Sequence, residues 1–414
     1  MVFIGFSKNK GVRNLYLSLM IAMGPFSAGL SGWAQGEPIE SSGSTMLIGT
    51  LAQLTHSDRG VRQTALLSLG AQAAALRQES TRSDFERLKI VVVPAVIPLL
   101  VDVSPGVRMA AVGALGEMPD FSAIAPLGKL FNSATPFQRA SRENPELYRA
   151  VKIRAATVLA KFGSEAVPAL SEALKDEDEQ VRSSATASLV ELVNTHRINM
   201  LQPLTQAMND PDPGVRRGAV VALGKIGVHA LKTLKDSLKD QDIMVRQLII
   251  QACARKEVMG TSGAIVLNEA LKDSDKTNRF LAVLALGPFK DPASPQALVR
   301  ALKDSEFMIR EAAASTLCEL GREAVPYLID VLGNPGFGHR DRVALVLGQI
   351  RDLRALPALV VALNDPDLSV RLCAARSLGS LRSKQAVPAL EKALKDPNAF
   401  VQEAAHQALE RLGK

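Results

Sequence analysis

The chain has 414 residues and a formal net charge of +7, with 49 Lys and Arg against 42 Asp and Glu. Residues 1–34 carry +3, residues 35–210 sum to −2, and residues 211–414 carry +6 from 29 basic and 23 acidic side chains. Aromatic residues are only 4% of the chain, so base-stacking platforms are scarce, and the charge excess is too mild for a nucleic-acid footprint. We therefore expect no nucleic-acid partner.

Residues 1–34 have the pattern of a secretory signal peptide. Basic residues up to Arg13 precede a short apolar run over 15–23, and small residues follow up to Ala34. This pattern predicts cleavage after Ala34 and an extracytoplasmic location, in a periplasm, a lumen or the medium. Gly24 and Pro25 interrupt a run that is short for a membrane span. An uncleaved membrane anchor is the alternative, and it is the only membrane contact we expect.

Residues 35–44 are predicted to be a flexible leader, and the first helix is expected near Thr45. From there to residue 414 one pattern recurs about eleven times: Val-Arg, two free positions, Ala, three more, then Leu-Gly. Repetition at a period of 20 to 50 residues is typical of a solenoid. The basic position of the pattern is occupied at 62, 108, 152, 182, 216, 246, 279, 310, 340 and 371, with glutamine at 402.

Most repeats are about 30 residues long, which is room for two helices and two tight turns. In the repeat over 163–193, Pro168 falls in the opening turn of the first helix, and the second helix begins at Val181. The fold class predicted is all-α, an α-α superhelix of about 11 two-helix repeats over residues 45–414. Glycine after the recurring leucine suits a helix end followed by a turn, at Gly70, Gly116, Gly224, Gly287, Gly348 and Gly379.

An arginine in the first turn of a helix opposes the helix dipole, so helix propensity does not explain it. Aspartates recur a few residues upstream, in pairs such as Asp210 and Asp212. We predict a structural ladder in which each arginine binds an aspartate of its own or the adjacent inter-helix turn. A basic stripe for nucleic acid is the alternative, but the aspartates cancel its charge. The ladder is assigned to Arg62, Arg108, Arg182, Arg216, Arg246, Arg310 and Arg371 with Asp178, Asp212, Asp242 and Asp367.

The sequence Ala-Val-Pro-Ala-Leu, followed by Ala-Leu-Lys-Asp and then Val-Arg, is plain over 166–182 and, in its first part, over 386–396. It resembles the short HEAT-like repeat of phycobilisome-lyase-type proteins over roughly residues 46–413. The resemblance implies α-α stacking, with first helices on the convex side and second helices on the concave side. It implies little about activity, because such repeats occur in bilin lyases, metal hydroxylases and plain scaffolds.

Two repeats are about 15 residues too long, and we predict insertions near 78–89 and 132–149. Loops carry function more often than scaffold elements do, and arginine and aromatic residues often anchor interfaces. Tolerated surface loops, or extra helices that close the N-terminal end, are the alternative. The candidate partner-binding residues in the second insertion are Phe137, Arg139, Arg142, Tyr148 and Arg149.

The sequence contains no recognisable catalytic or metal-binding motif. None of the five histidines precedes a glutamate, although deoxyhypusine hydroxylase, built from similar repeats, binds iron through His-Glu pairs. The sequence lacks Cys-x-x-Cys and His-x-x-x-His spacings, a phosphate loop and a nucleophile elbow. We therefore assign no catalytic residue, metal ligand or cofactor. Cys253, Cys318 and Cys373 lie in separate repeats, so they are read as small apolar residues, with a bilin-accepting or redox-active thiol as the alternative.

The sequence leaves two main functional hypotheses. One is an exported, non-catalytic scaffold that binds another protein. The other is a phycobilin lyase or phycobilisome-handling factor, which an export signal disfavours because bilin lyases act on cytoplasmic antenna proteins. Lesion binding on DNA is a third hypothesis, and the scarcity of aromatic residues disfavours it.

The repeat pattern places Leu223 on the buried face of a second helix. Leu223→Ala should lower the free energy of unfolding by about 2–5 kcal/mol, because a buried leucine leaves a cavity. Chemical denaturation of the variant and the parent protein measures this difference. A loss below about 0.5 kcal/mol would mean that the buried face is misassigned.

Overall fold

The computed structural model describes residues 41–79, 82–132, 144–196, 200–289 and 291–413. Every element in these residues is helical, and they form eleven successive two-helix repeats. This confirms the all-α solenoid expected from the sequence. The predicted signal peptide and the first six residues of the predicted leader lie outside the described residues. Two compact units divide the chain, one ending at Ala222 and the other beginning at Leu223.

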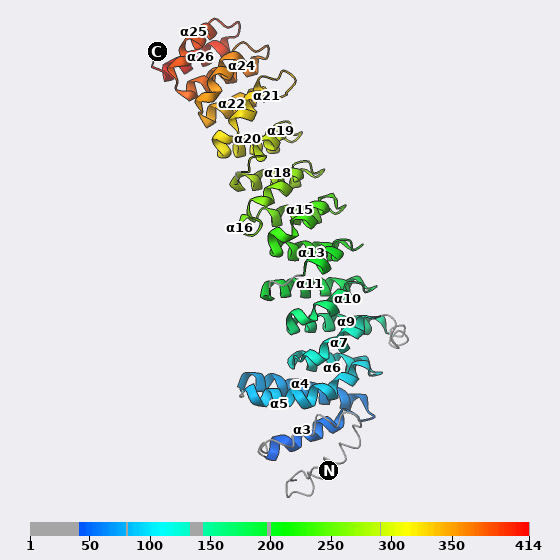
Figure 1. Ribbon diagram of the computed structural model, residues 1–414. Coiled ribbons are helices and arrows are strands. Elements are labelled where there is room, and N and C mark those ends of the chain that lie inside the picture. Colours follow the sequence, from blue (N-terminus) through cyan, green and yellow to red (C-terminus); the bar gives the residue numbers. More distant parts are fainter. Residues whose placement is uncertain (1–40, 80–81, 133–143, 197–199, 290, 414) are drawn as a thin grey trace. The chain divides into compact units, whose positions relative to one another are not determined.

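The first unit contains five repeats (Figure 1). Their first helices are α3, α5, α7, α10 and α12, and their second helices are α4, α6, α9, α11 and α13. The bounds are α3 Ser41–Gln53, α4 Arg59–Glu79, α5 Arg82–Val96, α6 Pro105–Glu117, α7 Ile124–Gly128, α9 Pro145–Leu159, α10 Val167–Ala173, α11 Glu179–His196, α12 Leu201–Ala207 and α13 Pro213–Ile226, of which the last runs on past Ala222.

The second unit contains six repeats. A short helix, α16 Lys256–Met259, precedes the first helix of its second repeat. The other bounds are α14 Leu231–Asp236, α15 Ile243–Cys253, α17 Gly263–Ala270, α18 Lys276–Leu286, α19 Ser294–Ala301, α20 Phe307–Leu320, α21 Val325–Leu332, α22 Arg340–Ile350, α23 Leu356–Ala362, α24 Leu368–Leu381, α25 Val387–Ala393 and α26 Ala399–Arg411.

Nine of the eleven described first helices have only five to eight residues, and six of these nine follow directly on a 3-10 segment. Proline occupies the opening α-helical turn of α10, α19, α21, α23 and α25, as predicted, where its missing N–H group costs no helical hydrogen bond. The second helices are longer and pack mainly on the second helices of the neighbouring repeats, as α6 does on α4 and α9. Their alanines and leucines form the core, and Leu223 is fully buried as expected.

The glycine after the recurring leucine lies inside its helix at five of the six positions, where the prediction of a helix end is wrong, whereas Gly287 directly follows the end of α18. Gly116 and Gly379 lie inside helices α6 and α24 with helical backbone angles. A Cβ on Gly116 would lie 2.8 Å from the Cγ2 of Val158, and one on Gly379 would lie 2.9 Å from the Cα of Ala408. The glycine therefore lets the next second helix approach closely. Several helices end elsewhere, at residues with positive φ such as Gly321.

Two boundaries also differ from the sequence-based expectation. Helix α3 begins at Ser41 rather than near Thr45, so residues 41–44 of the predicted leader are helical. The first predicted insertion, 78–89, is largely regular structure, because it forms the end of α4 and the first half of α5. The extra length of this repeat therefore lies mainly in two long helices, which is neither a surface loop nor an additional helix in the described residues.

None of the helices in the described part of the chain is long and apolar enough to cross a membrane.

Gly379→Ala should destabilise the protein by about 1–3 kcal/mol, the usual cost of overpacking, because the new Cβ collides with the backbone of α26. Gly49→Ala is the matched control. Gly49 lies in α3, and a Cβ added there would have no atom within 4 Å, so alanine should stabilise the helix by up to about 1 kcal/mol. Thermal or urea unfolding of both variants measures the two effects. Equal effects of the same sign would contradict the close-approach explanation.

Candidate functional site

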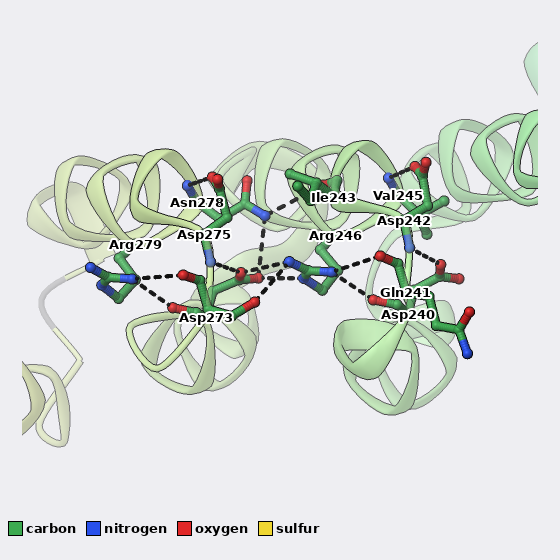
Figure 2. A network of polar contacts seen from close by, with 11 residues as sticks. Asp240, Gln241, Asp242, Ile243, Val245, Arg246, Asp273, Asp275, Asn278 and Arg279 are labelled. Atoms are coloured by element: carbon green, nitrogen blue, oxygen red, sulfur yellow. Dashed lines mark hydrogen bonds and ion pairs between the residues drawn. The ribbon is translucent and has the colours of Figure 1, made fainter.

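An arginine at the start of a second helix can connect two successive inter-helix turns, as Arg246 shows (Figure 2). Its Nη1 donates hydrogen bonds to the carbonyl oxygens of Asp240 at 2.7 Å and Gln241 at 3.4 Å, in the turn of its own repeat. Its Nε and Nη2 donate to the two carboxylate oxygens of Asp273, in the turn of the next repeat, at 2.8 and 2.9 Å. Such a bidentate pair fixes both distance and orientation.

This geometry explains why a cation is tolerated in the first turn of a helix. The guanidinium of Arg246 reaches back over six residues to carbonyl oxygens of the turn that directly follows the preceding helix, near the helix end where a positive charge is favourable. The N–H groups of its own helix are capped separately by Asp242, whose carboxylate accepts from the N–H of Val245 at 2.8 Å.

The same two-sided arrangement recurs within each unit. The fork of Nε and Nη2 binds a carboxylate of the next turn at 2.7–3.3 Å in five pairs. Two further basic residues pair through one nitrogen, Lys152 with Asp176 at 2.6 Å and Arg340 with Asp365. The five bidentate pairs are Arg62 with Asp102, Arg182 with Asp210, Arg246 with Asp273, Arg279 with Asp304, and Arg371 with Asp396.

The aspartates that accept these forks are not the four that were predicted from the sequence to form the ladder. Those four stand two residues later in their turns, and each accepts hydrogen bonds from backbone N–H groups at the start of its own second helix. These aspartates act as N-caps, because the carboxylate of a residue just before a helix can accept hydrogen bonds from the free N–H groups of the first helical turn. The four capping residues are Asp178, Asp212, Asp242 and Asp367.

The first aspartate of each turn has its own local role as well. Asp273 accepts from the N–H of Asp275 at 2.8 Å, which shapes the turn, and from the Nδ2 of Asn278 at 3.2 Å. The sequence signal that identifies this residue is its position six residues before the arginine, since that spacing recurs from 102 and 108 to 365 and 371. Both aspartates of several turns are visible in the sequence, but the prediction assigned the wrong member of the pair to the arginine.

The remaining predicted ladder arginines have the same backbone anchor. Arg108, Arg216 and Arg310 each donate from Nη1 to two carbonyl oxygens, five and six residues upstream, at 2.7–3.4 Å. Arg108 is 2% exposed, and burial lowers the pKa of its guanidinium. The turn after Arg108 continues into residues 133–143, which lie outside the described residues.

Burial and pairing act in opposite directions on the ladder carboxylates. Burial alone would raise the pKa of Asp273, but hydrogen bonds from Arg246, Asp275 and Asn278 and the charge of Arg246 outweigh it and lower the pKa. The bond to Asp273 raises the pKa of Arg246 in turn. Both groups are therefore charged at neutral pH, and the ladder stabilises the stack above the ordinary pKa of aspartate.

The predicted partner-binding residues do not form a described surface. Phe137, Arg139 and Arg142 lie outside the described residues. Tyr148 is only 9% exposed, with the Nζ of Lys152 4.8 Å from its ring centroid, so its assignment as an exposed contact is corrected. Tyr148 lies in the first turn of α9 and is one of the buried residues of that helix. Arg149 is partly exposed and lies 3.6 Å from Asp178.

The three cysteine thiols have raised pKa values, so none of them is activated as a nucleophile. Burial raises the pKa of Cys253 to about 12, and burial with the neighbouring Glu319 raises the pKa of Cys318 to about 11. Cys373 is buried, and its pKa is raised to about 11. Over the described part of the chain, His, Cys, Asp and Glu residues form no group of three that could bind a metal ion.

The second unit exposes apolar side chains where its second helices begin. We call these six residues the turn-edge apolar surface: Ile243, Met244, Phe307, Met308, Leu368 and Phe400, which are 38–72% exposed. They stand three or four residues after the first residue of their turns. The equivalent positions of the first unit, from Arg59 to Gly214, hold charged residues, glutamine, proline, glycine and, at position 150, alanine. Exposed apolar groups that recur in this way are typical of interaction surfaces.

The family of HEAT repeats matches residues 48–144, 137–202, 193–254, 264–338 and 325–410. No curated protein matches the chain. Among solved structures, an engineered protein is 18% identical with a TM-score of 0.37, covering 89% of this chain and 99% of that one. Human deoxyhypusine hydroxylase in complex with glycerol is 24% identical, with a TM-score of 0.27 and coverage of 72% and 99%. Kap121p is 15% identical, with a TM-score of 0.40, and the chain covers about half of it (53%) with 98% of its own length.

Asp273→Asn should lower the free energy of unfolding by about 2–3 kcal/mol, between the values for exposed and fully buried ion pairs. The variant leaves the Arg246 fork without its carboxylate. Glu269→Gln is the control, since Glu269 forms an exposed pair with Lys272 and should cost less than about 0.5 kcal/mol. Urea denaturation measures both, and equal losses would contradict the ladder's contribution.

The stability difference between the parent protein and Asp273→Asn should depend on pH. The pKa of Asp273 is lower in the folded than in the unfolded protein, so its contribution is complete above about pH 4 and disappears as the pH falls through the lowered pKa. Urea midpoints of both proteins between pH 2 and 7 test this. A difference that grows as the pH falls would contradict the assignment.

Cys318 should react with a maleimide slowly at pH 7, with a rate that rises about tenfold per pH unit toward pH 10, because its pKa is raised to about 11. Glutathione is the control, and its rate should level off near pH 9. Peptide mass mapping after timed labelling follows the individual cysteine. A plateau at Cys318 below pH 9 would indicate an activated thiol.

Proposed function

The chain belongs to the HEAT-repeat family, and on that premise we propose that it is a non-catalytic scaffold that binds another protein. The observation that carries the proposal is the pairing of a rigid repeated framework with the turn-edge apolar surface. In the described ladder, charged side chains such as Arg246 and Asp273 bind one another or backbone groups, so they stabilise the stack of repeats. Stacked repeats offer extended surfaces, and exposed aromatic and methionine side chains are the residue types that interfaces favour.

We also propose that the scaffold acts outside the cytoplasm. The support is the pattern of residues 1–34, with its basic lead, short apolar run and small residues before position 35. Fractionation of cells of the source organism, with the intact mass of the recovered protein, tests it. A soluble extracytoplasmic form that begins at or near Gln35 is expected. A full-length cytoplasmic protein would contradict export and restore the phycobilin-lyase alternative.

The lyase alternative has less support in the described residues. A thiol of this chain that accepted a bilin would have to ionise, whereas burial raises the pKa values of all three cysteines to about 11 or 12. The repeat pattern itself is the feature that motivates this alternative. Incubation with a phycobilin and detection of a covalent adduct by mass would reinstate it.

Site-specific photo-crosslinking in living cells tests the scaffold proposal. A photoreactive amino acid at Met308, on the turn-edge apolar surface, should give a discrete adduct with one or a few proteins. The same amino acid at Val361, which is 71% exposed on the first helix α23 of the same unit, is the control and should not give that adduct. Identical adducts at both positions, or none at Met308, would contradict the proposal.

A further inference from the structure

The ladder of the second unit is interrupted after Arg310. The Nη1 of Arg310 donates to the carbonyl oxygens of Asp304 at 2.7 Å and Ser305 at 3.0 Å, the same anchor as in Arg246 and Arg279. Its guanidinium is therefore held in the ladder orientation, with Nε and Nη2 directed away from its own turn. In the described part of the chain, no residue accepts a hydrogen bond from either of these two atoms.

The next turn lacks the carboxylate that would complete this pair. Asn334 occupies the position of the first aspartate, and its Oδ1 accepts from the N–H of Gly336 at 2.9 Å, as the aspartates do in other turns. The turn itself is altered, because α22 begins six residues after Asn334, at Arg340, whereas α20 begins three residues after Asp304. The structure thus keeps the turn-forming contact and omits the charged partner of Arg310.

The open fork is accessible. Arg310 is half-buried, and the described buried side-chain nitrogens that lack a partner do not include its Nε or Nη2, so both atoms reach solvent. Asp304, the carboxylate of its own turn, is already engaged by Arg279 at 2.7 and 3.0 Å. The nearby acidic Glu311 pairs with Arg342. The guanidinium of Arg310 is therefore not neutralised by these carboxylates.

Apolar residues and a lysine occur close to Arg310 in the sequence and in the altered turn. Phe307 and Met308, in the first turn of the same helix, are 58% and 62% exposed, and the guanidinium of Arg310 lies 5.7 Å from the ring centroid of Phe307. Phe337 from the altered turn is buried, with the Nζ of Lys303 4.1 Å from its ring centroid. A ligand at this place would meet one unpaired guanidinium edge beside exposed apolar surface, in the half of the chain with 29 basic and 23 acidic residues.

We propose that Arg310 binds the carboxylate of an aspartate or glutamate from a partner protein, with apolar residues next to it lying on Phe307 and Met308. The inference rests on the proposed scaffold function and names one contact of that interface. A carboxylate is favoured over a phosphate because the equivalent forks of this chain bind carboxylates at 2.7–3.3 Å. The partner would supply in trans what Asp273, Asp304 and Asp396 supply within the chain.

The test uses the full-length 15N-labelled protein and the peptide acetyl-Leu-Asp-Leu-amide as the probe. The Nε–H resonance of Arg310, identified by its absence from Arg310→Lys, should shift and saturate with this peptide. Acetyl-Leu-Asn-Leu-amide and inorganic phosphate should bind at least about tenfold more weakly, since they lack the matched charge or shape. An equal response to both peptides, a stronger response to phosphate, or no response would overturn the proposal.

Two variants locate the contact. Arg310→Gln should weaken binding of the Asp peptide at least about tenfold, the factor that a lost charged hydrogen bond brings. Asn334→Asp should do the same by supplying the missing carboxylate within the chain, and it should raise the melting temperature. Asn334→Asp keeps Arg310 and its anchor, so it remains informative if Arg310→Gln folds poorly. Unchanged peptide affinity in Asn334→Asp would contradict the proposal.

The scaffold function and the carboxylate contact at Arg310 would be contradicted by different results. A cross-linked partner whose affinity is the same for the parent protein and Asn334→Asp would leave the scaffold and remove the Arg310 contact. Peptide binding at Arg310 without any protein adduct at Met308 would leave the carboxylate site and contradict the scaffold.

Discussion

A guanidinium that binds two successive turns at once is the interaction on which this solenoid depends. Each two-helix repeat is too small to bury its apolar faces alone, so its stability comes from its neighbours. Close contact between second helices, such as that of Ala408 with Gly379, supplies apolar burial. The bidentate arginine fixes the register, because its planar fork accepts a carboxylate in only one orientation.

The fold and the existence of the ladder could be predicted from the sequence, but the aspartate that each arginine binds could not. Periodicity identified the repeats, the two helices and the buried position of Leu223, because all of these follow from local spacing. Partner choice does not, since Asp210 and Asp212 stand two residues apart and only the conformation of the turn decides which one faces the preceding repeat. The prediction fails at five of the six glycines for a similar reason, because in the sequence a glycine required by a neighbouring helix looks like one required by a turn.

The candidate contact region was predicted less well than the fold. The sequence drew attention to the unusual aromatic and arginine residues of 132–149, of which Tyr148 is buried in the core. The turn-edge apolar surface has no unusual composition, because Phe307 or Leu368 differs from a core residue only in its position within the repeat. Arg310 itself is inconspicuous in the sequence, although residues 333–339 visibly replace the acidic turn of other repeats with three glycines and a proline. In regular repeats the candidate sites therefore lie where the pattern changes, and the contacts show which residue each change leaves without its partner.

Exchange of the arginine Nε–H protons with solvent tests the central claim most directly. We expect slow exchange at Arg246, Arg279 and Arg371, whose Nε–H groups bind carboxylates, and exchange at least about tenfold faster at Arg310, which reaches solvent. Site-resolved NMR of the full-length protein at neutral pH measures all four. Equal exchange at the four arginines would contradict a closed ladder with an open position at Arg310.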